Sequence, residues 1–127
     1  MKEIIKSVGK ILSEGINYRF LRWKGKPQYP YFIGELHRVG GSDESGEEEY
    51  RMLLTGFYRG GDDMQLYEAA ERVGEMFPED TGRLIRCRAG TMLVSAGEIL
   101  PDIQTEGETE LLKMQITLVI KRWKGKG

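Results

Sequence analysis

The sequence predicts an α+β fold in which two helices, near residues 2–13 and 63–77, pack on a mostly antiparallel sheet of about four to six strands. Three observations predict it. Apolar residues recur with helical spacing in two segments, and β-branched and aromatic residues concentrate in several extended runs. The helices also stand between groups of strands instead of alternating with single strands. The length of 127 residues suits a single domain over 1–127.

The first predicted helix covers residues 2–13. Ile4, Val8 and Leu12 recur at every fourth position and form an apolar stripe, while lysines occupy the opposite face. Gly15 is placed to end this helix as a left-handed cap.

The second predicted helix covers residues 63–77 and has its own apolar stripe. The stripe consists of Leu66, Ala70, Val73 and Phe77. Asp62 and Asp63 stand where a carboxylate caps the free N–H groups of a first turn, and Pro78 ends the helix. Glycine weakens a helix interior, so we expect Gly74 to pack closely against the sheet.

Extended runs account for most of the remaining chain. They cover residues 16–23, 29–39, 50–58, 83–94 and 113–123, and Gly90 interrupts the fourth. Residues 95–110 form either a long loop or a loop that holds a short strand at 99–103. The run at 50–58 is apolar on both faces, so we expect a central strand that is covered on both sides by helix, sheet or a partner.

Composition narrows the class of protein. Apolar residues make up 39% and charged residues 31%, as in folded soluble proteins. The net charge of −1 gives no overall electrostatic case for nucleic acid or membrane as a partner. The N-terminus lacks the apolar block of a signal peptide, and no apolar run approaches the roughly 18 residues of a membrane span. We therefore expect an intracellular protein.

An acidic segment at residues 40–49 joins two predicted strands. Its carboxylates are Asp43, Glu44, Glu47, Glu48 and Glu49. At about ten residues it exceeds the usual hairpin link of about two to five. The segment is either a solvated loop or an arm that orders against a basic partner surface. Its carboxylates lack the alternating spacing of a calcium loop, which argues against a metal site.

Two groups of cations stand elsewhere in the chain. One is Arg83, Arg86 and Arg88, and the other is Lys121, Arg122 and Lys124 around Trp123. A basic tail with an aromatic residue could bind nucleic acid by phosphate contact and stacking. Alternatively, the basic strands of one subunit meet the acidic segment of the next, where complementary charge sets the register of a repeated contact. We favour the second interpretation.

Signals for catalysis are weak. His37 is the one histidine and Cys87 the one cysteine, so they supply neither a histidine pair for a metal nor a disulfide. Flanking arginines could lower the pKa of an exposed Cys87 thiol, but a small apolar side chain in a strand is the favoured interpretation. No phosphate-binding loop of the Gly-x-x-x-x-Gly-Lys-Ser/Thr type occurs. We expect neither an enzyme nor a cofactor or metal site.

The aromatic residues of the extended runs point to association. Two helices cannot cover both faces of a sheet with this much apolar surface, so we expect an apolar patch that another copy closes.

Three stretches carry a family resemblance: Tyr29–Leu36 with its Pro-Tyr pair, Tyr50–Tyr58 after a polar loop, and Met64–Phe77. In these stretches, and in the order of elements over nearly the whole chain, the sequence resembles the small tail-terminator and tail-completion proteins, minor tail proteins of long-tailed phages and prophages. Residues 95–110 depart from that pattern.

The resemblance implies a mixed α/β fold and a homo-oligomeric ring, commonly a hexamer, that caps the tail tube and meets the head. It implies no catalytic residue. The expected partners are the protein itself and the tail-tube and head-connector proteins, with neither membrane nor nucleic acid. The expected location is the host cytoplasm during assembly and then the virion.

Two other classes stay open. One is a nucleic-acid-binding module that uses the strand with Arg83, Arg86 and Arg88 together with the Lys/Trp C-terminal tail. It predicts an affinity that falls steeply with salt. The other is a small enzyme or ligand-binding domain, which predicts a concave pocket with convergent polar groups.

Overall fold

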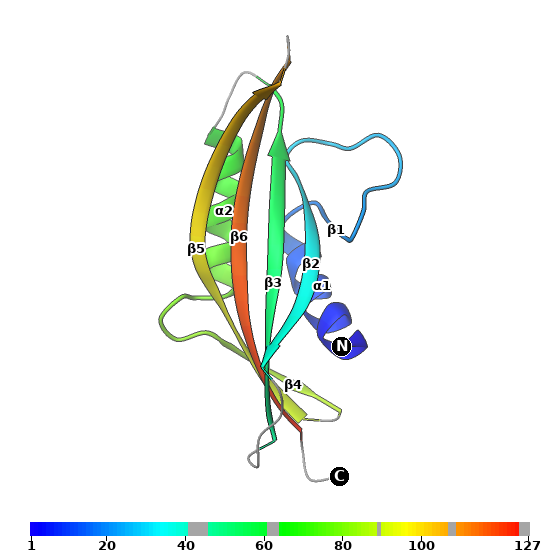
Figure 1. The fold of residues 1–127 in the computed structure, drawn as a ribbon, viewed down its shortest axis with the longest axis vertical. Coiled ribbons are helices and arrows are strands. Elements are labelled where there is room, and N and C mark those ends of the chain that lie inside the picture. The colour runs from blue at the N-terminus through cyan, green and yellow to red at the C-terminus, as the bar shows by residue number, and fades with distance from the viewer. Residues whose placement is uncertain (41–45, 61–63, 89, 107–108, 125–127) are drawn as a thin grey trace.

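The computed structural model describes residues 1–40, 46–60, 64–88, 90–106 and 109–124 (Figure 1). Two helices and six strands follow one another along the chain. They are α1 (Lys2–Gly15), β1 (Tyr18–Phe20), β2 (Tyr31–Gly40), β3 (Glu47–Tyr58), α2 (Met64–Met76), β4 (Arg83–Cys87), β5 (Gly90–Glu106) and β6 (Thr109–Lys124). The predicted α+β fold is therefore confirmed.

All six strands join one sheet in the order β1-β2-β3-β6-β5-β4. Every pairing is antiparallel except that of β1 with β2, which is parallel. Both helices lie on the same side of this twisted sheet, behind it in Figure 1. We call that side the helical face and the opposite side the open face.

The core lies between the helical face and the helices. Every second residue of β3, from Glu48 to Tyr58, is buried there, while the residues between them are half-buried. Ile4, Val8 and Leu12 of α1 are fully buried against this face, as their spacing predicts. The prediction that β3 is central is confirmed, because it lies between β2 and β6. The helices cover only one face of β3, so cover of the other face by a partner stays a prediction.

Small residues on the helical face make room for large rings. A Cβ atom at Gly56 would lie 2.5 Å from Phe32 Cε1, and one at Gly34 would lie 2.6 Å from the Tyr18 hydroxyl oxygen. Both distances are too short for any side chain, so glycine is required where these aromatic rings lie across the strands.

The ends of the helices differ from prediction. Helix α1 runs through Gly15, and Ile16 follows in extended conformation, its N–H bonded to the Leu12 carbonyl. Gly15 is therefore not a left-handed cap. A Cβ atom at Gly74 would meet nothing within 4 Å, so the expected close packing there is wrong. The predicted capping by Asp62 and Asp63 lies outside the described residues.

Residues 95–110 are the largest departure from prediction. Instead of a loop, β5 runs to Glu106 and β6 begins at Thr109, so the two strands form a long hairpin. An irregularity between Ala96 and Ile99 shifts the register of the pairing with β6. Gly97 and Pro101 suggested a break because both weaken regular strands, but a bulge and an edge strand accommodate them.

The first strand is also shorter than predicted. Only Tyr18–Phe20 of the run at 16–23 pairs with β2. Leu21 adopts φ 68°, the left-handed region that bulky residues rarely occupy, and this turns the chain away from the sheet.

Candidate interaction surfaces

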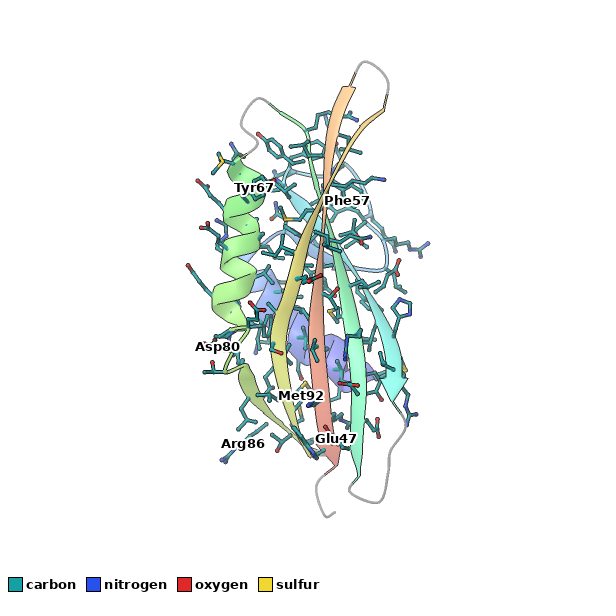
Figure 2. The ribbon with its side chains drawn as sticks, turned by 60° about the vertical axis from the view of Figure 1, so that its left-hand side comes forward. Glu47, Phe57, Tyr67, Asp80, Arg86 and Met92 are labelled. Atoms are coloured by element: carbon teal, nitrogen blue, oxygen red, sulfur yellow. The ribbon has the colours of Figure 1, made fainter. Side chains whose placement is uncertain are left out.

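The acidic residues expected in a loop lie largely in strand β3. Glu47, Glu48 and Glu49 pair with Trp123, Arg122 and Lys121 of β6, so the acidic and basic segments meet within one chain. Figure 2 shows Glu47 at one end of β3 and Phe57 at the other. The remaining two carboxylates, Asp43 and Glu44, lie outside the described residues.

A buried ionic cluster lies where β3, β6 and α1 meet. Glu48 is 4% exposed and accepts a hydrogen bond from the Tyr50 hydroxyl. Burial, followed by the hydrogen bond to Glu48, raises the pKa of Tyr50. The Arg122 guanidinium donates to Glu3 Oε2 over 2.9 Å, and its Nε finds no acceptor among the described residues. This side chain therefore fastens α1 to the sheet and is not free for a partner.

The three arginines do not form one surface. Arg83 and Arg86 both lie on β4, but side chains alternate along a strand and an odd spacing places them on opposite faces. Arg88 follows in the turn after β4. All three are exposed, and Arg86 projects outward near the end of the sheet that holds Glu47 (Figure 2). The expected arginine cluster on one strand is therefore split.

The basic residues of β6 also divide. Lys121 lies on the open face, exposed and opposite Glu49, whereas Arg122 points to the helical face. Lys124 ends β6 opposite Gly90.

The histidine and the cysteine have different surroundings. His37 is exposed, and its Nε2 lies 3.2 Å from the Glu35 carboxylate. Cys87 packs against the core at the end of β4, with its sulfur 3.9 Å from the Ser7 hydroxyl. Burial raises the pKa of the Cys87 thiol, which opposes thiolate chemistry.

The open face carries a row of rings that the sequence prediction did not identify. Tyr31 and Phe57 are cross-strand neighbours whose rings stack at 5.0 Å, and Trp23 packs on Tyr31 at 5.2 Å. The Arg19 guanidinium lies 5.0 Å from the Trp23 ring, and the Lys113 ammonium lies 5.7 Å from the Phe57 ring. We call these five residues the cation-capped aromatic row. They bind the segment after β1 to the sheet.

A sequence signal for this region exists. Residues 15–34 contain four cations and no carboxylate, and the five residues Arg22–Lys26 recur unchanged at positions 122–126. Strand prediction alone treated the segment as a turn after the first strand.

Two stretches of strand have no strand paired along their outer edge. Strand β4 pairs only with Gly90–Val94 of β5, so β5 continues to Glu106 without a described neighbour on that side. The Phe77 carbonyl accepts a hydrogen bond from the Ala96 N–H, which closes the edge at that one point. On the other side of the sheet, β1 covers only Phe32–Gly34 of β2.

Other site types find little support in the described part of the chain. A shallow hollow of about 260 Å³ lies between the end of α1 and α2, and Asn17 and Arg72 on its wall already donate to backbone carbonyls. No three histidine, cysteine or carboxylate side chains gather there as a metal site requires. Neither α1 nor α2 is long and apolar enough to cross a membrane.

The described residues form a two-layer α+β protein whose open sheet face carries no helix and in which β5 and β2 each have a stretch of unpaired outer edge. The sequence matches no protein-family model and no curated protein.

Proposed function

We propose that the protein is a structural subunit whose copies join edge to edge into a ring, as a tail-terminator or tail-completion protein does at the end of a phage tail. The observation that carries the proposal is the unpaired edge of β5 after Ala96. Ile99 is 42% exposed and Leu100 53% exposed on this stretch. Unpaired N–H and C=O groups beside exposed apolar side chains are a template for adding a strand.

The directions of the strands fit such a contact. Strands β2 and β6 both run opposite to β3, and β5 runs opposite to β6, so β2 and β5 are antiparallel. A β5 edge that pairs with the β2 edge of a neighbour, along Glu35–Gly40, would therefore continue an antiparallel sheet. Pro101 has no N–H to donate. We therefore expect the strand of the neighbouring copy to pair either with the residues before Pro101 or with those after it.

The geometry also favours a ring over a pair. The β5 and β2 edges are different surfaces at opposite sides of the sheet, so their contact is head-to-tail. Head-to-tail contacts close into rings when the rotation between copies allows it. The half-buried apolar side chains of the open face lie outside these two unpaired stretches; they are Ile33, Leu53, Leu93 and Val119.

Within this proposal the charged residues of β3 and β6 act inside the subunit. Glu48 and Arg122 are buried, so they hold the fold, while Glu47 and Glu49 lie on the open face with Lys121. Glu47, Glu49 and Lys121 belong to the central strands β3 and β6, so they lie away from the edges that join copies.

The test replaces the apolar edge of β5 with charge. Ile99→Lys with Leu100→Lys is expected to abolish self-association, because lysine blocks strand addition at an edge. Sedimentation velocity across a concentration series measures the mass, and circular dichroism checks the fold. The matched control is Met64→Lys with Tyr67→Lys, which adds the same charge to exposed positions of α2 and is expected to leave association unchanged.

Equal loss of association in both double variants would contradict the edge contact. Gene neighbours that encode tail-tube and tape-measure proteins would support the assignment to a phage tail, and neighbours of an unrelated kind would count against it.

A further inference from the structure

The charges of this chain are segregated. Residues 15–34 carry a charge of +4, from Arg19, Arg22, Lys24 and Lys26, while the whole chain carries −1, which leaves −5 for the remainder. A basic stretch on an otherwise acidic protein attracts anions locally even when the net charge is near zero.

The structure holds this stretch at one end of the sheet and adds cations to it. The cation-capped aromatic row fixes the segment on the open face and brings in Lys113 from β6. Arg59 follows β3 and is exposed, and its charge opposes the effect of burial on the pKa of Tyr31, so it lies near the same rings. Cations from three separate parts of the chain therefore lie near these rings, and Asp102 of β5 is the cross-strand neighbour of Lys113.

The backbone of this segment is strained at Leu21, an exposed residue. Leu21 has φ 68° and is 62% exposed, so this residue gains little from burial. Its N–H donates to the Gly34 carbonyl over 2.9 Å, and the Arg22 N–H donates to the Phe20 carbonyl. Backbone strain of this kind persists where the surroundings enforce it, and it concentrates at binding sites. Here it presents Arg22 and the two lysines after it to solvent.

We propose that this basic surface, made of residues 19–26 with Arg59 and Lys113, binds the phosphate backbone of double-stranded nucleic acid without reading its sequence. Closely spaced phosphates are the natural partner of a surface whose exposed groups are chiefly cations. Trp23 and Phe57 each have a cation over the ring, and Tyr31 packs on Trp23, Phe57 and Tyr29, so these contacts compete with stacking of an unpaired base. Backbone contact is therefore favoured over stacking. The proposal does not depend on ring formation.

The second copy of the repeated five residues is a built-in comparison. In that copy Arg122 is buried and paired with Glu3, and Glu47, Glu48 and Glu49 lie along the paired strand. In the first copy Arg22 is exposed and no carboxylate lies nearby in sequence. The first copy is therefore the one that can bind an anion.

The experiment measures fluorescence anisotropy of a short labelled duplex at several salt concentrations. The variant Arg22→Ser/Lys24→Ser/Lys26→Ser is expected to weaken binding about tenfold or more at low salt and to flatten the salt dependence by about two to three ions. The matched control, Lys2→Ser/Lys6→Ser/Lys10→Ser, removes equal charge from the exposed face of α1 and is expected to change affinity less than about threefold. Circular dichroism confirms that both variants fold.

Several results would overturn the proposal. They are equal weakening by the two triple variants, absence of duplex binding at low salt, and tighter binding of a single strand or of polyglutamate than of the duplex. Loss of duplex binding with self-association intact would leave the proposed ring unaffected, so the two proposals fail separately.

Discussion

The guanidinium of Arg122 shows how one residue connects two layers. It lies in a strand, yet its partner Glu3 belongs to the first turn of α1, and Glu48 faces it across the pairing of β3 with β6. Removing one partner of a buried ion pair leaves the other charge without compensation, which costs more than the pair itself contributes.

We expect Arg122→Met to lower the free energy of unfolding by about 3 kcal/mol. Urea denaturation measures it, and Lys121→Met, at an exposed neighbouring position, is expected to change stability by no more than about 0.5 kcal/mol. Adding Glu3→Gln to Arg122→Met should recover part of the loss. Equal stability of the two single variants would show that the ion pair does not hold α1.

Tyr18 gives stability a defined pH dependence. The side chain is 5% exposed, and burial raises its pKa from 10.0 to about 12. The folded state therefore keeps the proton longer than the unfolded state, so the contribution is complete below pH 10 and is lost as pH rises to about 12. This loss corresponds to about 2–3 kcal/mol.

The variant Tyr18→Phe lacks this ionisation. We expect its stability relative to the unaltered protein to increase between pH 10 and about 12, as measured by urea denaturation at each pH. A difference in the free energy of unfolding between the two proteins that stays constant across that range would mean that Tyr18 has the same pKa in the folded and unfolded states.

Predictability from the sequence differed between elements. Both helices and the central strand follow from periodicity, because burial on one face selects residues at helical or strand spacing. The β5–β6 hairpin did not follow from the sequence. Gly97 and Pro101 weaken a regular strand, so they indicate a break when only the local sequence is considered. The bulge and the unpaired edge that accommodate them depend on how the strands pair in the sheet. Glu47–Glu49 were expected in the segment that joins two strands, and their pairing with β6 is a long-range contact that local pattern does not reveal.

The candidate surfaces were less predictable still. The arginines of β4 looked like a cluster along the sequence, but strand alternation separates Arg83 from Arg86. The cation-capped aromatic row combines Trp23 and Tyr31 with Phe57 and Lys113, which are distant in sequence, so only the sheet register reveals it.

Strand position also sets local stability. Strands β3 and β6 have a hydrogen-bonded neighbour on each side, whereas β5 after Ala96 has one on a single side. We expect amides of Glu48–Tyr58 to exchange with solvent more than about tenfold more slowly than those of residues 97–106 in dilute protein. Hydrogen exchange by mass spectrometry measures this. If copies join through the β5 edge, the amides of residues 97–106 are expected to exchange more slowly as the protein concentration rises. An exchange rate that does not depend on protein concentration would count against that contact.

At the scale of the whole molecule, both helices lie on one face of the sheet, and stretches of the β5 and β2 edges have no paired strand among the described residues. We propose that a subunit of this form pairs these unpaired strand edges with the edges of other copies. The head-to-tail relation of the β5 and β2 edges then requires a defined number of copies if the contact closes.

Native mass spectrometry of the full chain across a concentration series tests this most directly. We expect one closed stoichiometry above the monomer, which is lost in the Ile99→Lys/Leu100→Lys variant. A monomer at every concentration, or an open-ended ladder of masses, would contradict it.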